Sequence, residues 1–215
     1  MTSDPETGIA GYSDETIASI LRTGQAPGGG GAVKVIHPIM PYKTFSVMSD
    51  KDVQDLVAYL RTLEPISNAV PKRALNEEPP AWTPPTTPPA EAPAEPVARG
   101  EYLVTLANCA GCHTPKGDDG SPMTDMLLAG AVMPGDAGEI ASNLTPDEAT
   151  GIGKWTEAEI ATFMLTGTLP SGEPIEGAMA QQIQRRFSKL TEDDAAAIAA
   201  YLKSIPAVSN EPKAP

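Results

Sequence analysis

The stretch LANCAGCHTPKG, Leu106 to Gly117, contains both cysteines and one of the two histidines of this 215-residue chain. Cys109 and Cys112 are separated by two residues, and His113 directly follows the second cysteine. Two thiols at this spacing can each add to a vinyl group of one haem, while the adjacent imidazole is aimed at the iron; CxxCH is the haem-attachment pattern for that reason. The motif predicts one covalently bound haem c on Cys109, Cys112 and His113.

Other uses of these cysteines stay open but fit the sequence less well. A redox dithiol is expected beside a βαβ pattern, which this chain lacks. A zinc site needs four ligands, and beyond these three residues only His37 and scattered acids remain. The motif could also occur by chance. Haem attachment is the interpretation that agrees with both the motif and its surroundings.

Apolar periodicity and capping residues predict helices joined by long loops. One helix is expected over Arg99 to Ala107, leading into the cysteines. The capping box Thr156 to Glu159 predicts a short helix through Met164. Thr191 and Ser49 precede two further helical patterns. Their apolar positions are Ile198, Tyr201, Leu202 and Ile205, and Val53, Leu56, Val57 and Leu60. Nothing alternates as a strand, so the expected fold class is all-α.

The chain contains two copies of one unit, because two pairs of segments match at nearly the same offset. Thr7 to Gly24 matches Thr150 to Gly167, and Met48 to Leu63 matches Leu190 to Ile205. The second copy has about fifty residues ahead of its match, which contain the CxxCH, and the first copy has none of them. We expect an N-terminal truncation, with decay of the first unit or its completion by another chain as alternatives.

A proline-rich segment separates the two copies. Ala74 to Pro96 has proline pairs, Ala and Glu, with almost no large apolar residue. Such a composition predicts an extended, semi-rigid spacer, because it buries too little surface to offset its ordering entropy. We therefore expect an incomplete half domain without CxxCH over residues 1–73, a linker over 74–96, and a complete mono-haem domain over 97–215.

Charge and hydropathy limit the partners. The formal net charge of -13 opposes binding to nucleic acid or anionic lipid and favours basic protein surfaces. No run of about 18 apolar residues predicts a transmembrane segment. The N-terminus, MTSDPETGIAGYSDET, has neither the basic nor the apolar region of a signal peptide.

The sixth iron ligand is expected to be a methionine, because the other histidine, His37, lies in the other copy. The candidates in the second unit are Met123, Met126, Met133, Met164 and Met179. Met164 falls on the buried face of a predicted helix, where a methionine side chain more often packs in the core than binds a metal. Met179, in a predicted flexible loop before the last helix, is the chosen ligand, with Met133 as the second choice. His/Met ligation closes both axial positions and suits electron transfer.

Val97 to Val208 resembles a class I cytochrome c domain. The resemblance rests on Gly100 and Tyr102 in the first helix, then CAGCH, then GEIASNLTPDEATGIGKWTEAEI, an axial-Met loop and AAAIAAYLKSIP. In that fold the first and last helices cross, where Gly100 and Tyr102 would meet Tyr201. Ile140 to Ile160 is similar to tandem cytochrome c subunits of membrane-bound dehydrogenases for alcohols, aldehydes and gluconate.

The resemblance implies roles for further residues. Tyr102, Asn143 and Trp155 would line the haem pocket or meet its propionates, with ordinary packing as the equal alternative. Ser3 to Leu63 looks like the C-terminal half of a preceding domain, in which Met40 of HPIMPYKTF would be a distal ligand. No CxxCH precedes Met40, so that role is unfilled within this chain. Further haems are expected in the full-length protein.

The resemblance also implies an electron carrier or cytochrome subunit rather than an enzyme. It would pass electrons from a periplasmic or membrane-bound dehydrogenase to the respiratory chain, with redox proteins as partners and the periplasm as its location. The alternative is a haem enzyme such as a dihaem peroxidase, which requires an open iron position and an acid-base group. A docking role for the first half unit is a third possibility.

Overall fold

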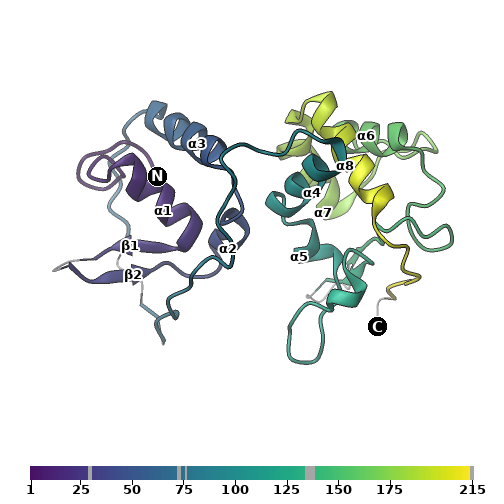
Figure 1. The fold of residues 1–215 in the computed structure, drawn as a ribbon, viewed down its shortest axis with the longest axis horizontal. Helices are drawn as coiled ribbons and strands as arrows, with labels where there is room; N and C mark the ends of the chain where they lie inside the picture. Colours follow the sequence, from purple (N-terminus) through teal and green to yellow (C-terminus); the bar gives the residue numbers. More distant parts are fainter. Residues whose placement is uncertain (29–30, 72–73, 76, 134–138, 214–215) are drawn as a thin grey trace. The chain divides into compact units, whose positions relative to one another are not determined.

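The computed structural model describes residues 1–28, 31–71, 74–75, 77–133 and 139–213. The chain divides into two compact units, Met1–Ala92 and Pro93–Pro215, called unit 1 and unit 2 below (Figure 1). The division falls within the predicted linker. Position 73, the predicted end of the first half domain, lies outside the described residues.

Unit 2 is mainly helical. Its elements are α4 (Pro96–Leu106), α5 (Cys109–His113), the 3-10 helix η2 (Thr124–Met126), β3 (Ala131–Val132), β4 (Ile140–Ala141), α6 (Glu157–Thr166), α7 (Gly177–Arg185), the 3-10 helix η3 (Phe187–Lys189) and α8 (Glu192–Ser204). The three predicted helices of this unit are confirmed. The first begins at Pro96, three residues earlier than expected, because proline is favoured in the first turn of a helix.

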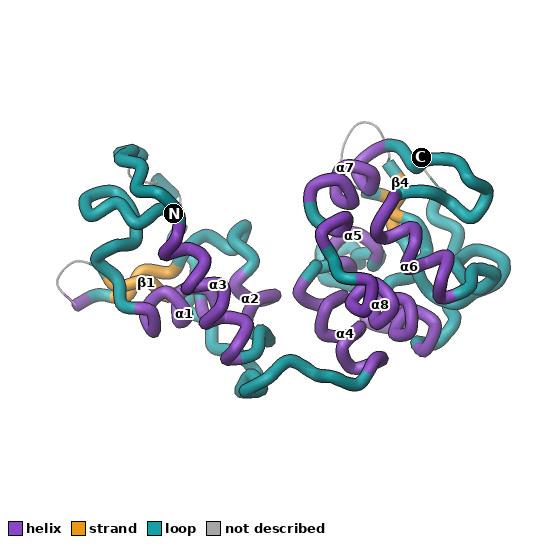
Figure 2. The backbone as a smooth tube through the Cα atoms, turned by 90° about the horizontal axis from the view of Figure 1, so that it is seen from above, coloured by secondary structure: helices purple, strands orange, loops and turns teal. Residues whose placement is uncertain are grey.

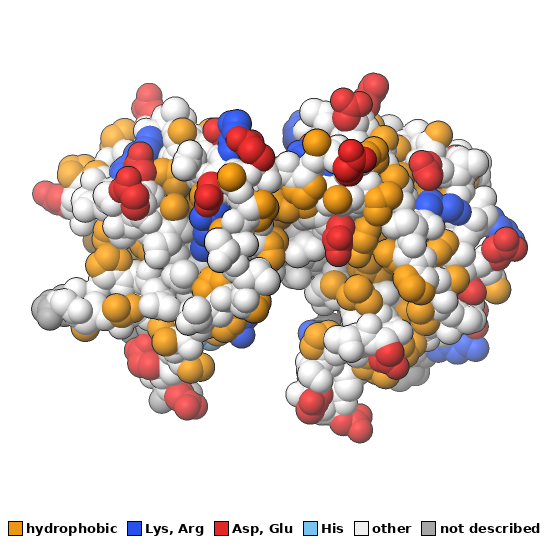
Figure 3. All heavy atoms as spheres, in the orientation of Figure 1, with side chains coloured by type: hydrophobic (Ala, Val, Ile, Leu, Met, Phe, Trp, Pro, Cys, Tyr) orange, Lys and Arg blue, Asp and Glu red, His pale blue; other side chains and the backbone are white. Residues whose placement is uncertain are grey.

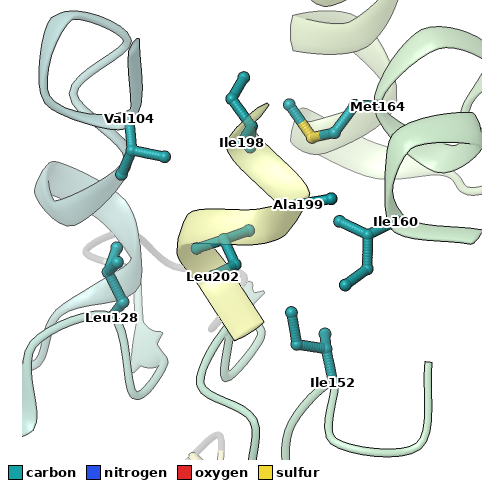
Figure 4. Close-up of a cluster of buried hydrophobic side chains, with 8 residues drawn as sticks. All are labelled: Val104, Leu128, Ile152, Ile160, Met164, Ile198, Ala199 and Leu202. Carbon is teal, nitrogen blue, oxygen red and sulfur yellow. The ribbon is translucent and has the colours of Figure 1, made fainter. Parts of the chain in front are cut away.

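The core of unit 2 forms around α8, which lies against both α4 and α6 (Figures 1 and 2). Ile198, Ala199 and Leu202 of α8 are buried. Figure 4 shows these side chains between Val104 of α4 on one side and Ile160 of α6 on the other. Met164, on the same helix as Ile160, is also buried here, as its spacing predicts.

Gly100 permits the close crossing of α4 and α8. A Cβ atom on Gly100 would lie 2.0 Å from the carbonyl oxygen of Ala197 and 2.6 Å from the Cβ of Tyr201. The expected meeting of Gly100 and Tyr201 is therefore confirmed. An ion pair between Arg99 Nε and Asp194 Oδ1, 2.8 Å long, joins the same two helices.

Unit 1 contains α1 (Asp14–Thr23), β1 (Gln25–Pro27), β2 (Val33–Val35), α2 (Tyr42–Phe45) and α3 (Asp50–Thr62). Ile17 of α1 packs against Val57 and Leu60 of α3. The helix predicted after Ser49 is α3, and the Ser49 hydroxyl accepts a hydrogen bond from the Asp52 N–H.

The two units repeat the same local structures, as the sequence match predicts. Asp4 Oδ1 accepts hydrogen bonds from the N–H and hydroxyl of Thr7, both 2.7 Å long. Asp147 Oδ1 accepts the same pair from Thr150, at 2.7 and 2.8 Å. The first helix of each matched segment ends at a left-handed glycine, Gly24 with φ 69° and Gly167 with φ 72°.

The mostly helical structure agrees with the expected all-α class. The expectation that no strand forms is wrong, because there are two antiparallel pairs, β1 with β2 and β3 with β4. Their strands have only two or three residues, too short to show an alternating pattern. The loop expected around Met179 is in fact helical, since Met179 lies in α7. Among the described residues, no helix has the length and apolar character needed to cross a bilayer.

Candidate haem-binding site

The short helix α5 carries the CxxCH motif. Asn108, with φ 57°, ends the preceding turn in the left-handed conformation, and α5 follows at once. Because Cys109, Cys112 and His113 stand at i, i+3 and i+4, their side chains share one face of that turn. Both thiols are free; Cys109 is half-buried and Cys112 is exposed. The motif therefore presents two thiols and an imidazole to the same space.

The orientation of His113 is fixed by a backbone carbonyl. Its Nδ1 lies 2.7 Å from the carbonyl oxygen of Ser142, which follows β4. A carbonyl only accepts, so Nδ1 donates the proton and Nε2 keeps its lone pair. Burial lowers the pKa of His113, and the bond to Ser142 only partly opposes this. The imidazole is therefore neutral at physiological pH, which is the form that binds a metal ion.

Cys109 is a neutral thiol at physiological pH before any group is attached. Burial, with a smaller contribution from Cys112, raises the pKa of Cys109 to about 11. A structural zinc or iron–sulfur site would need four ligands in one place. The described residues contain no group of three or more His, Cys, Asp and Glu side chains placed to hold a metal ion.

Met179 is positioned by the start of α7. Gly177 opens this helix with φ 78°, and the N–H of Ala178 donates to Glu139 Oε1 over 2.7 Å. A carboxylate at a helix N-terminus satisfies an unpaired N–H and complements the helix dipole. Met179 is half-buried and packs against the same apolar cluster as Cys109. Met133, the second choice, is half-buried beside β3, and its N–H donates to the Glu139 carbonyl over 2.7 Å.

Tyr102 and Trp155 belong to the helical packing of unit 2. Tyr102 is buried in α4, with the guanidinium carbon of Arg99 5.8 Å from its ring centroid. Trp155 lies just before α6 and meets Phe163 edge to face, with ring centroids 5.5 Å apart. Trp155 also packs against the cluster that Cys109 and Met179 contact.

Asn143 is buried, and its amide bonds within the protein. Its Nδ2 donates to Thr150 Oγ1 over 3.0 Å and to the Val208 carbonyl over 2.8 Å. Its Oδ1 accepts from the N–H and hydroxyl of Thr145, at 2.9 and 2.8 Å. These bonds join the loop after β4 to the segment after α8.

The residues expected in the first half domain lie in unit 1. Met40 is 44% exposed and directly precedes the α2 region. His37 lies in the same turn, where its Nδ1 accepts from the Ile39 N–H over 3.2 Å. The carbonyl oxygen of His37 also accepts a hydrogen bond from the Met40 N–H over 2.9 Å.

Sequence reasoning missed Ser142 and Glu139, which orient His113 and α7. Ser142 acts through its backbone carbonyl, which any residue could supply, so its identity gives no signal. Glu139 acts on Ala178, far along the chain, and only the folded structure reveals this pairing.

The residues of α5 fit a covalently attached haem. Two thiols and a neutral imidazole with a free Nε2 share one face of a turn. The surrounding side chains, including Leu103, Ala110 and Phe163, are apolar and pack against one cluster. This donor set matches thioether attachment with one histidine ligand.

Comparison with known proteins identifies the same family. Residues 97–206 match the cytochrome c family model. The chain is 33% identical to the alcohol dehydrogenase (quinone) cytochrome c subunit of Gluconobacter oxydans (strain 621H), over 97% of this chain and 46% of that protein. It is 34% identical to the gluconate 2-dehydrogenase cytochrome c subunit of Pantoea cypripedii, over 95% of this chain and 50% of that protein. It is 32% identical to a diheme cytochrome c-type protein of Cereibacter sphaeroides, over 97% of this chain and 71% of that protein.

The chain thus spans about half the length of the alcohol and gluconate dehydrogenase subunits that it matches. Its likeness to them extends through both units, although the family model covers only the second. The chain belongs to the cytochrome c family, as a haem-binding electron carrier related to the cytochrome c subunits of dehydrogenases.

Proposed function

We propose that unit 2 holds one haem c through thioether bonds from Cys109 and Cys112, with His113 Nε2 and the Met179 sulfur as axial ligands. When bound, the haem supplies the reversible one-electron couple of its iron. The observation that carries the proposal is the hydrogen bond from His113 Nδ1 to the Ser142 carbonyl, because it leaves Nε2 unprotonated on the face shared with both thiols.

Each residue has a separate task. The two cysteines fix the position of the group, and the Ser142 carbonyl sets the tautomer and plane of His113. Met179 would supply the second iron ligand, and the bond from the Ala178 N–H to Glu139 Oε1 fixes the start of the helix that carries this methionine. A thioether ligand favours the reduced iron and raises the potential, which suits a carrier.

For unit 1 we propose a second, incomplete cytochrome c-like half domain in residues 1–73. The support is the sequence repeat together with the paired Asp–Thr bonds and helix-ending glycines described above. In the repeat Met40 takes the place of Met179, so it would be the distal ligand of another haem. No CxxCH precedes Met40, and the role stays unfilled within this chain.

The proposed route takes electrons from a dehydrogenase and delivers them to a respiratory chain, in the periplasm. It is supported by the relatives named as cytochrome c subunits of alcohol and gluconate dehydrogenases. With a net charge of -13, the chain favours partners with basic docking surfaces. On the face drawn in Figure 3 the acidic side chains are spread out rather than gathered in one patch.

The proposal is tested with the haem-loaded full chain in a potentiometric titration. Wild type should show one reversible one-electron couple and slow cyanide binding. Met179→Ala should lose the sulfur-to-iron charge-transfer band, lower the potential and bind cyanide readily.

Met133→Ala is the matched control and should behave as wild type. The absence of a reversible couple in wild type would overturn the carrier assignment. Loss of the charge-transfer band in Met133→Ala, with the band retained in Met179→Ala, would overturn the ligand assignment.

A further inference from the structure

The segment after α8 binds the half of unit 2 that carries the CxxCH motif. We call residues 208–210 the tail segment; they lie beyond the residues that match the cytochrome c family model, which end at position 206. Asn210 is half-buried, and its Nδ2 donates to the carbonyl oxygens of Ala129 and Gly130 over 3.0 and 3.2 Å. One side-chain amide therefore ties the end of unit 2 to the turn before β3.

The turn that Asn210 binds also holds the backbone of His113. The Gly130 N–H donates to the His113 carbonyl oxygen over 2.7 Å. This N–H and the Ala129 carbonyl belong to one planar peptide group. Asn210 and His113 therefore bond to opposite sides of the same rigid plane, and a change in the first bond displaces the second.

The tail segment holds the ring of His113 by a second route. The Ser142 carbonyl accepts from His113 Nδ1, and the next residue, Asn143, donates from Nδ2 to the Val208 carbonyl over 2.8 Å. The Asn143 side chain is buried. Both hydrogen bonds that position His113, at its carbonyl and at its Nδ1, thus come from segments that the tail segment binds.

Unit 1 repeats the backbone bond of the tail segment. The Asn68 N–H donates to Thr7 Oγ1 over 2.9 Å, as the Asn210 N–H donates to Thr150 Oγ1 over 3.0 Å. The Asn210 side chain, in contrast, bonds to the half of the unit that contains the CxxCH, which the first copy lacks. The backbone bond is therefore common to both copies, whereas the side-chain bonds belong to the copy with the haem motif.

We propose that Asn210 is a positioning residue for His113, acting through the peptide group between Ala129 and Gly130. A hydrogen bond at the ring nitrogen opposite the iron raises the basicity of a histidine ligand, so its alignment affects the reduction potential. Without the two Asn210 bonds, the Gly130 turn and the His113 backbone gain freedom, and the bond to Ser142 weakens. The inference rests on the proposed role of His113 as an iron ligand and is independent of which methionine lies opposite it.

The test compares wild type and Asn210→Ala as haem-loaded full chains. In the reduced, diamagnetic form, NMR should show the Gly130 N–H and the His113 Nδ1 proton exchanging roughly tenfold faster in the variant, as expected for loss of one net hydrogen bond. The variant should also have a higher reduction potential, because a weaker bond at Nδ1 makes the imidazole a poorer donor to ferric iron. Asn210→Gln keeps the amide and should recover most of both wild-type values.

Three control variants separate positioning from stability. Asn68→Ala, at the matching place in unit 1, and Ser209→Ala, exposed within the tail segment, should both behave as wild type. Thr156→Ala, which removes the capping box of α6, should lower the urea midpoint but leave the reduction potential unchanged.

The inference is overturned if Asn210→Ala keeps either the wild-type exchange rates or the wild-type potential, or if Thr156→Ala shifts the potential equally. A wild-type chain without a reversible couple would instead contradict the proposed function. The Gly130 exchange measurement needs no iron ligand, and an unchanged rate in Asn210→Ala would then overturn this inference as well.

Discussion

The substitution Gly100→Ala tests the helix crossing on which unit 2 is built. In an isolated helix this change stabilises by up to ~1 kcal/mol, because alanine has the higher helix propensity. Here the new methyl would stand 2.0 Å from the Ala197 carbonyl oxygen, and real Cβ contacts essentially never fall below 3.0 Å. The obstacle is backbone, so α4 must move away from α8 by about 1 Å (3.0 minus 2.0 Å).

The cost follows from that displacement. A gap of this size forfeits about a quarter to a half of each dispersion contact across the interface, and overpacked sites typically cost ~1–3 kcal/mol. After the gain of up to ~1 kcal/mol in helix propensity we expect a net destabilisation of about 1 kcal/mol. With a denaturant slope of ~1–3 kcal/mol per molar for urea, the midpoint should fall by roughly 0.5 M.

The assay is urea unfolding of the haem-loaded chain, followed by circular dichroism in the Soret band, which reports on unit 2. Glu101→Ala is the matched control, because Glu101 is exposed on the same helix and this substitution adds no atom to the crossing, so its midpoint should not move. An unchanged or higher midpoint for Gly100→Ala would refute the close crossing of α4 and α8.

Three further predictions use the same urea assay. Thr156→Ala removes the capping box of α6 and should cost about 1 kcal/mol, and an unchanged midpoint would contradict this. Lys203→Met removes the bonds from Nζ to the Gly153 and Trp155 carbonyls, 2.7 and 3.0 Å long, and should cost ~1–3 kcal/mol. Hydrogen bonds from Thr150 lower the pKa of Asp147 below 3.8, so their stabilisation is present above pH 3.8 and is lost as pH falls through the folded pKa. Asp147→Asn should flatten the dependence of the urea midpoint on pH below 3.8. An equally steep dependence in the variant would contradict the assignment of this stabilisation to the Asp147–Thr150 hydrogen bonds.

Local sequence signals predicted the features of the fold that local interactions determine. The capping box at Thr156 and the cap at Thr191 both appear as expected, because each joins residues within one turn. The CxxCH spacing likewise predicted that both thiols and His113 would share one face, since five residues suffice for that turn.

Features that depend on distant contacts were not predictable in the same way. Met179 was expected in a flexible loop before the last helix, but it lies in α7, whose start is held by the bond from the Ala178 N–H to Glu139 Oε1, far along the chain. The proline-rich linker over residues 74–96 was expected to be an extended, semi-rigid spacer because of its composition. Part of it instead contacts unit 1, through the ring pair of Trp82 with Tyr42 and through the backbone carbonyls of Pro89 and Ala90. Any residue supplies a backbone carbonyl, so the side chains give no signal of these bonds.

The most direct test of the central claim is the intact mass of the denatured chain after maturation with a signal peptide and a haem-attachment system. The account predicts a mass increase of one haem per chain that survives denaturation and acid extraction, and its loss in the Cys109→Ala, Cys112→Ala double variant. A wild-type chain without covalent haem, or haem retained by the double variant, would contradict it.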